Sequence, residues 1–176
     1  MSQLVKNIIR FVLFILVQAL LFKMPPLHRF VTPYIYFLYI LWLPFNLPRF
    51  WLTAIGFFFG LTLDYFTYTP GLHAAACTLI AYVRPFLVNM LLSQEGIEKN
   101  YASPSIVSMG WAPYATYVFV LTLLHHTYLV FIEWMSFGTF FYFVGKVLAT
   151  TAVSLGLILV TELLFFRKEK FRTNTA

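Results

Sequence analysis

The stretch GFFFGLTLDYFTYTPGLHAAACTLIAYVRPF, residues 56–86, decides the fold of this chain. It contains two apolar runs on either side of the turn Thr69-Pro70-Gly71, and the first run includes one acidic residue, Asp64. Because a turn with this Pro-Gly pair leaves almost no slack, we expect two antiparallel helices. An acidic side chain within such an apolar run is costly in a membrane, so Asp64 is the first residue to consider for a special role.

The composition of the whole chain indicates a membrane environment. Hydrophobic residues make up 61% of the 176 residues, aromatic residues 20% and charged residues only 10%, and the mean hydropathy is +0.81. A soluble domain needs more polar surface than this composition supplies. We therefore predict an all-α integral membrane protein with a single transmembrane domain over residues 1–176.

Six apolar runs are candidates for membrane-spanning helices. They cover residues 8–22, 34–47, 50–68, 72–92, 113–135 and 140–166. The second run is short for a bilayer core and is bracketed by Pro33 and Pro44. It is either a short spanning helix with extended ends or a re-entrant hairpin. The expected architecture is a compact bundle of about six transmembrane helices.

The distribution of basic residues predicts the orientation. With six spans both termini face the same side, and only Lys23 and Arg29 then lie on the opposite side, with Lys146 inside a span. Because Lys and Arg collect in cytoplasmic loops, both termini are predicted to be cytoplasmic. The basic residues on that side would be Lys6, Arg10, Arg49, Arg84, Lys99, Arg167, Lys168, Lys170 and Arg172.

The net charge of +6 does not indicate nucleic acid as a partner. The only dense basic run, residues 167–172, directly follows the last apolar run, and such a run is typical of an anchor beside anionic membrane lipids. Cys77 is the only cysteine, so neither a disulfide nor a cysteine metal cluster is available.

Small residues at helical spacing predict close helix packing. In the run 50–68, Gly56, Gly60 and Asp64 follow one another at intervals of four and fall within about 80° around a helix. The run 140–166 has a second set within about 60°, namely Gly145, Ala149, Ala152 and Gly156. These patterns predict a tight bundle.

Asp64 is expected to face the bundle and to be hydrogen-bonded there, because exposure to lipid is expensive. Counting outward from the turn places His73 one helical turn from Asp64 in height, which makes His73 its predicted partner. Arg84 lies about 12 Å deeper, too far for a simple pair, and either extends to the headgroups or is buried. Pro85 after it can kink the helix. Whether Asp64 has a structural or a ligand-binding role is open at this point.

His125 and His126 are the residues that most suggest catalysis, but their pattern does not support it. Neighbouring residues point about 100° apart on a helix, so the two cannot serve one tetrahedral metal site without distortion. The sequence contains none of the motifs H-E-x-x-H, G-x-S-x-G or G-x-x-x-x-G-K. We therefore predict no enzymatic activity, no metal and no cofactor. Glu133 is expected to pair with Lys146, and Glu162 with the basic run.

Several stretches together resemble the rod shape-determining membrane protein family MreD of bacteria. The resemblance covers nearly the whole chain, and residues 56–86 are its specific part. The other matching stretches are Asn7-Ile8-Ile9-Arg10-Phe11, the break from Leu43-Pro44-Phe45 to Pro48-Arg49, the pair His125-His126 and the turn Ser136-Phe137.

The resemblance implies a component of the cell-wall elongation machinery in the bacterial cytoplasmic membrane. Members of this family associate with the bitopic protein MreC, and through it with MreB filaments and the peptidoglycan glycosyltransferase and transpeptidase pair. Their helix arrangement is similar to that of the substrate-binding subunits of energy-coupling-factor transporters. By that analogy a cavity would open to the outside, and Asp64, Gly71, His73 and Arg84 would lie near it or support it.

Two hypotheses for the function follow. In the first, the bundle is a scaffold that docks the transmembrane helix or periplasmic segment of MreC, with the stripe of Gly56 and Gly60 making the close contact. In the second, it is a small-molecule-binding transport subunit that uses a cavity above Asp64 and His73. The residues predicted to serve the partner or the pocket are Gly56, Gly60, Asp64, Gly71, His73, Arg84 and Pro85.

Overall fold

Long apolar runs favour helices in a membrane, because a helix satisfies its own backbone hydrogen bonds. The computed structural model describes residues 3–23, 31–92, 103–134 and 139–164, and five of its helices are long and apolar enough to span a bilayer. They are α1 (Gln3–Lys23), α3 (Arg49–Thr67), α4 (Leu72–Leu91), α7 (Trp111–Trp134) and α8 (Phe140–Leu164). The prediction of an all-α, multi-pass membrane protein is confirmed.

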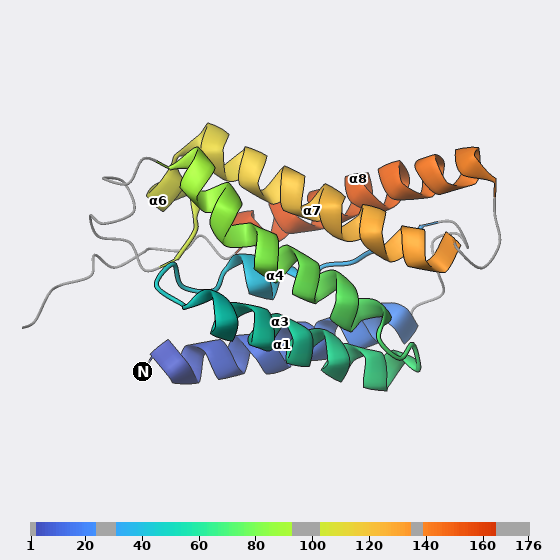
Figure 1. Ribbon diagram of the computed structural model, residues 1–176, viewed down its shortest axis with the longest axis horizontal. Coiled ribbons are helices and arrows are strands. Elements are labelled where there is room, and N and C mark those ends of the chain that lie inside the picture. The colour runs from blue at the N-terminus through green and yellow to red at the C-terminus, as the bar shows by residue number, and fades with distance from the viewer. Residues whose placement is uncertain (1–2, 24–30, 93–102, 135–138, 165–176) are drawn as a thin grey trace, which may run out of the picture.

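The helices run back and forth along the long axis of the molecule (Figure 1). α3 packs most extensively on α4, α4 also packs on α7, and α7 packs on α8, while α1 lies against α3. A one-turn helix, α6 (Ile106–Met109), lies against the start of α7. Figure 1 shows α1 beginning and α8 ending toward the same end of the bundle.

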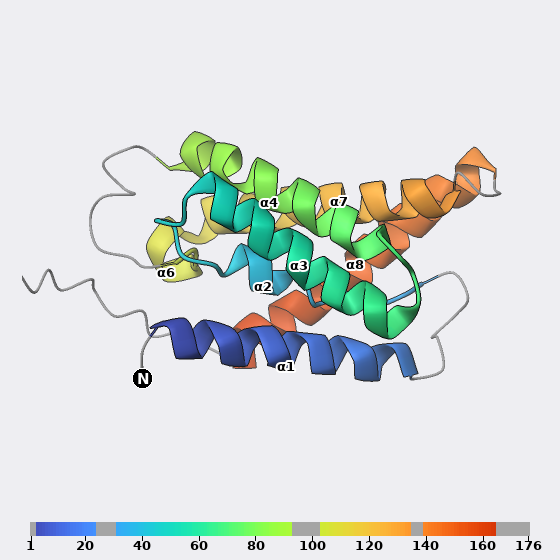
Figure 2. The same ribbon diagram turned by 60° about the horizontal axis from the view of Figure 1, so that its bottom comes forward.

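The second predicted span takes an unusual form. Only α2 (Leu38–Leu41) is helical, and extended chain precedes it. All of residues 34–43, which we call the central segment, are buried. Figures 1 and 2 place α2 in the middle of the bundle, with the chain entering from the end where α1 finishes and leaving toward the end where α3 begins. Of the two forms expected, the structure has the short helix with extended ends.

Side chains of distant helices bind the first half of the central segment. Gln18 on α1 accepts hydrogen bonds through Oε1 from the backbone N–H of Ile35 (2.9 Å) and Tyr36 (3.4 Å), and its amide donates to the carbonyl of Pro33 (3.0 Å). Ser154 on α8 accepts from the N–H of Tyr34 at 3.1 Å. These contacts replace the bonds that a helix would have formed internally.

The second half is bound in the same way. Arg84 on α4 donates from Nη2 to the carbonyl of Leu43 and from Nε to the hydroxyl of Tyr117 (2.8 Å). That hydroxyl in turn donates to the carbonyl of Leu41 at 2.9 Å. Because Arg84 is buried, the alternative in which it extends to the headgroups is wrong, and Arg84 is not a topology-determining loop charge.

The two stripes of small residues face in different directions. A Cβ atom at Gly60 would lie 2.5 Å from Ala74 Cα and from the carbonyl oxygen of His73, and one at Gly56 would lie 2.8 Å from Ala81 Cβ. The α3 stripe is therefore occupied by α4 of the same chain. On α8, a Cβ atom at Gly156 would meet nothing within 4 Å.

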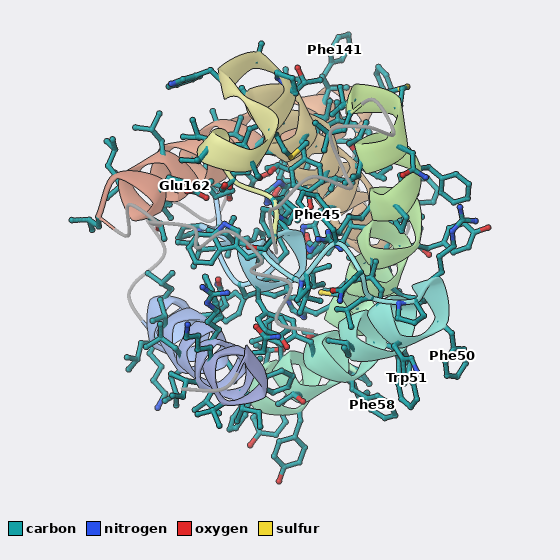
Figure 3. The ribbon with its side chains drawn as sticks, turned by 90° about the vertical axis from the view of Figure 1, so that its left-hand side faces the viewer. Phe45, Phe50, Trp51, Phe58, Phe141 and Glu162 are labelled. Atoms are coloured by element: carbon teal, nitrogen blue, oxygen red, sulfur yellow. The ribbon has the colours of Figure 1, made fainter. Side chains whose placement is uncertain are left out.

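Large aromatic side chains cover the outside of the bundle. Figure 3 shows Phe50, Trp51 and Phe58 pointing outward from α3 and Phe141 pointing outward from α8, and all four are exposed. In a membrane these faces meet lipid. In contrast, Glu162 lies on the inner side of α8 and accepts a hydrogen bond from Trp42 Nε1 at 2.8 Å. The basic run with which Glu162 was expected to pair lies outside the described residues.

Gln18→Leu should destabilise the central segment while leaving the helices in place. The substitution keeps the volume but leaves the buried N–H of Ile35 without its acceptor, which costs about 1–3 kcal/mol of unfolding free energy. Hydrogen exchange should accelerate at Ile35 and Tyr36 and not in α3. Thr53→Val, which removes a hydroxyl bonded within its own helix, is the matched control. Equal exchange at Ile35 in the two variants would contradict the assignment.

Gly60→Ala should destabilise the protein, whereas Gly156→Ala should have little effect. At position 60 the added methyl group collides with the α4 backbone, and such overpacking typically costs about 1–3 kcal/mol. At position 156 the same methyl group meets no neighbour. Thermal unfolding in detergent measures both variants. A melting temperature for Gly60→Ala equal to that of Gly156→Ala would show that α3 and α4 are not in this close contact.

Candidate functional site

Asp64 lies in the last turns of α3 with only 3% of its surface exposed. Its carboxylate points at the first turn of α4. Oδ2 accepts from the backbone N–H of Gly71 (3.1 Å) and Ala74 (2.9 Å), and Oδ1 accepts from the N–H of His73 (2.9 Å). The prediction that Asp64 faces the bundle and is hydrogen-bonded is confirmed.

The sequence around the turn explains why this carboxylate is needed. α4 begins after Gly71, which has a φ of 86°, a conformation that suits glycine. Because glycine has only a hydrogen atom as its side chain, it offers no cap to the helix. The first N–H groups of a helix have no partner within it, and they carry the positive end of the helix dipole. Asp64 supplies the cap from the neighbouring helix, so an acidic residue in an apolar run is stabilised by the start of α4.

His73 is the predicted partner of Asp64, and the structure confirms the pair. Its Nδ1 lies 2.9 Å from Asp64 Oδ1, and the hydroxyl of Thr69 lies 3.1 Å from each of these two atoms. Since three backbone N–H groups already donate to the carboxylate, it acts as an acceptor and Nδ1 carries the proton. In the neutral ring Nε2 is then an acceptor, and this buried atom has no hydrogen-bond partner among the described residues.

A cavity of about 610 Å³ opens at the end of the bundle where α1 finishes and the turn between α3 and α4 lies. The helix ends and the turn that surround it are visible at one end of the molecule in Figures 1 and 2. The lining residues come from α1, the start of the central segment, the α3–α4 hairpin and the end of α7. They are Leu16, Ala19, Leu20, Phe22, Lys23, Thr32, Tyr34, Phe66, Thr67, Thr69, Leu72, His73 and Glu133.

The predicted site residues do not all meet at this cavity. His73 lines it, and Asp64 lies directly behind His73. Arg84 follows His73 by eleven positions on α4, about 16 Å along the helix, and is bound to the central segment there. Arg84 is therefore not among the residues that line this cavity, and a supporting role for it stays a prediction. Pro85 lies inside α4, which continues through it to Leu91.

The two histidines of α7 are buried and bind different parts of the molecule. His125 Nε2 lies 2.8 Å from the hydroxyl of Tyr36, and the ring stacks on Phe37 with centroids 4.6 Å apart. His126 Nε2 lies 3.3 Å from Ser154 Oγ. The two rings thus have separate partners. Among the described residues, no three His, Cys, Asp or Glu side chains are grouped to hold a metal.

The predicted ion pair between Glu133 and Lys146 is also present. Lys146 Nζ lies 2.5 Å from Glu133 Oε2 and joins the end of α7 to the start of α8. The turn Ser136-Phe137 between these helices lies outside the described residues. Glu133 also lines the cavity, so the pair contributes a polar edge to it.

Sequence reasoning missed several residues that hold the interior together. Gln18, Tyr117 and Ser154 bind the central segment, and none of them belongs to a recognisable motif. A signal was nevertheless available for Gln18, because an amide in the middle of an apolar run needs a partner for the same reason as Asp64.

No family model, curated protein or solved structure matches this chain. The resemblance to the MreD family stays a prediction from the sequence, with residues 56–86 as its specific part. Within that stretch lie Asp64, Gly71 and His73, which the structure brings together at one turn.

Asp64→Asn should destabilise the hairpin of α3 and α4. An amide has one acceptor oxygen, so its NH₂ group would face at least one backbone N–H that Asp64 now accepts. Leaving buried donors unpaired costs about 1–3 kcal/mol each in unfolding free energy. Thermal unfolding and hydrogen exchange at Gly71 and Ala74 measure the effect. Thr62→Val on the same helix is the control, because its hydroxyl bonds only to its own helix. Unchanged exchange at both amides would refute the capping role.

Proposed function

We propose that the protein is a non-enzymatic scaffold of the complex that elongates the bacterial cell wall. It would bind MreC and, through MreC, connect the MreB filament with the peptidoglycan glycosyltransferase and transpeptidase pair. It would lie in the cytoplasmic membrane with both termini in the cytoplasm, next to anionic lipids. The resemblance of residues 56–86 to the MreD family is the sequence basis of this proposal.

The filled interior supports a holding function. The central segment occupies the middle of the bundle, and side chains from α1, α4, α7 and α8 bind its polar groups. Breaking these bonds in a low-dielectric interior is costly, which favours one fixed arrangement of the helices. A bundle of this kind acts most simply through its outward faces, by fixing the position of another membrane helix.

The outward stripe of α8 is the face that best fits a partner helix. Ala152 and Gly156 are exposed, and a Cβ atom at Gly156 would meet nothing within 4 Å. Small residues at this spacing let two membrane helices approach closely. The α3 stripe, which the sequence favoured for docking, is occupied by α4, so in the proposed function docking moves to α8.

Gly156→Leu should weaken the capture of MreC from solubilised membranes by about tenfold, because a bulky side chain there keeps the partner helix at a distance. The melting temperature of the isolated protein should stay unchanged, since position 156 has open space. Val12→Phe, which adds bulk to the exposed face of α1, is the matched control and should leave capture intact.

Normal capture of MreC by a stable Gly156→Leu protein would rule out α8 as the docking face. Capture that fails equally in Gly156→Leu and Val12→Phe would show a general defect of the membrane protein. A Gly60→Leu variant would be uninformative for docking, because its side chain collides with α4 and disturbs the fold itself.

The second candidate function, a small-molecule-binding transport subunit, is favoured by the cavity beside His73. It requires a water-soluble ligand and a surface for an energising partner. Stabilisation of the purified protein by a member of a vitamin panel would support it over the scaffold.

A further inference from the structure

The cavity changes from apolar to polar along α1. Leu16, Ala19 and Leu20 form its inner wall, and Lys23 lies at the end of the helix. Leu16 and Leu20 are 55% and 61% exposed, so the same residues also face the surroundings of the bundle. In a membrane those surroundings are acyl chains, and the end of a spanning helix reaches the headgroups. The lining therefore changes from apolar to polar along α1 in the same direction as a lipid leaflet changes from acyl chains to headgroups.

Three polar side chains that line the cavity already use their donors within the protein. The hydroxyl of Thr67 donates to Leu63 at 3.0 Å, and the hydroxyl of Thr69 donates to Asp64 at 3.1 Å. His73 uses its Nδ1 proton on Asp64, so Nε2 of the neutral ring is an acceptor; it is buried and has no hydrogen-bond partner in the described part of the chain. Because a buried polar atom without a partner is costly, Nε2 marks the place where a donor is missing.

Charged groups at the mouth fit a zwitterionic headgroup. Lys23 offers an ammonium group to a phosphate, and Glu133 offers a carboxylate to an amine while it remains paired with Lys146. A volume of about 610 Å³ is in the range of pockets that bind a small organic molecule, and it is too small for a folded partner domain.

We propose that the cavity binds one membrane lipid whose headgroup carries a hydrogen-bond donor, an amine or a hydroxyl. The donor reaches Glu133 and, once the side chains that bury it shift aside, Nε2 of His73, while the phosphate lies near Lys23 and an acyl chain lies along Leu16 and Leu20. Asp64 binds Nδ1 of His73, so that Nε2 of the neutral ring is an acceptor. This inference does not depend on the scaffold function.

Two lipids that differ only in donor ability provide the test. Phosphatidylethanolamine has N–H donors, whereas the quaternary ammonium group of phosphatidylcholine has none, and both are zwitterionic. With identical acyl chains, native mass spectrometry of the delipidated protein should show phosphatidylethanolamine bound about tenfold more tightly, the scale of one buried hydrogen bond. His73→Phe should remove this preference. Equal binding of the two lipids to the unmodified protein would overturn the proposal.

A second variant separates loss of the cavity from loss of the fold. Ala19→Phe places a ring in the cavity from α1 and leaves Asp64 and His73 untouched, so it should abolish lipid binding without lowering the melting temperature. Val12→Phe places the same ring outside the cavity and should bind lipid normally. Retained binding in Ala19→Phe would show that the lipid lies elsewhere on the protein.

The soluble headgroup distinguishes a lipid from a free solute. Glycerophosphoethanolamine has the same amine and phosphate but no acyl chains. It should not displace the lipid at a comparable concentration, because the contacts with Leu16 and Leu20 are missing. Effective competition would overturn the lipid assignment in favour of a water-soluble amine.

Discussion

The structure depends on the hydrogen bonding of the central segment, of which only one turn, Leu38–Leu41, is helical. Backbone N–H and C=O groups have no water to bind in the hydrocarbon layer, so non-helical chain at this depth must be enclosed and bound by protein. The central segment meets this requirement with Gln18, Arg84, Tyr117 and Ser154, which come from four different helices. The arrangement of those helices follows from the positions of these partners.

The contact between α3 and α4 obeys the same rule at a helix end. The first N–H groups of α4 need acceptors, Gly71 supplies none, and Asp64 provides both carboxylate oxygens. Close approach of the two backbones at Gly60 brings the carboxylate within reach. The carboxylate of Asp64, which is costly in an apolar interior, and the N–H groups at the start of α4 thus stabilise each other. His73 is held in a fixed orientation as a result.

Local sequence patterns predicted the contacts whose partners lie close to each other in the sequence. The hairpin of α3 and α4, the pair of Asp64 and His73, and the pair of Glu133 and Lys146 all follow from apolar run length, a Pro-Gly turn and helical counting. Partners more than 100 residues apart, such as Tyr34 and Ser154, leave no local pattern. A polar residue in an apolar run indicates that a partner exists but does not identify it.

The sequence also did not predict which side of each helix faces the interior. The small residues of α8 form an arc just as those of α3 do, but only the packing shows that the interior takes Thr150, Ser154 and Ile158 of α8 and leaves Gly156 outside. For Arg84 the headgroup position and the buried position both stayed open, because sequence alone does not show the carbonyl of Leu43 within the bundle. Both cases concern which side of a correctly predicted helix faces inward.

The long reach of the central segment's bonds has a consequence for biogenesis. A ribosome delivers residues 34–43 to the membrane long before Ser154 and Glu162 have been synthesised, yet these two residues bind Tyr34 and Trp42. During that interval the segment has unmet polar groups and too little helix to be released into lipid on its own. The nascent chain therefore needs an environment that is aqueous or lined by protein, such as an insertase provides. It stays there until α8 has been inserted and the complete bundle can enter the lipid.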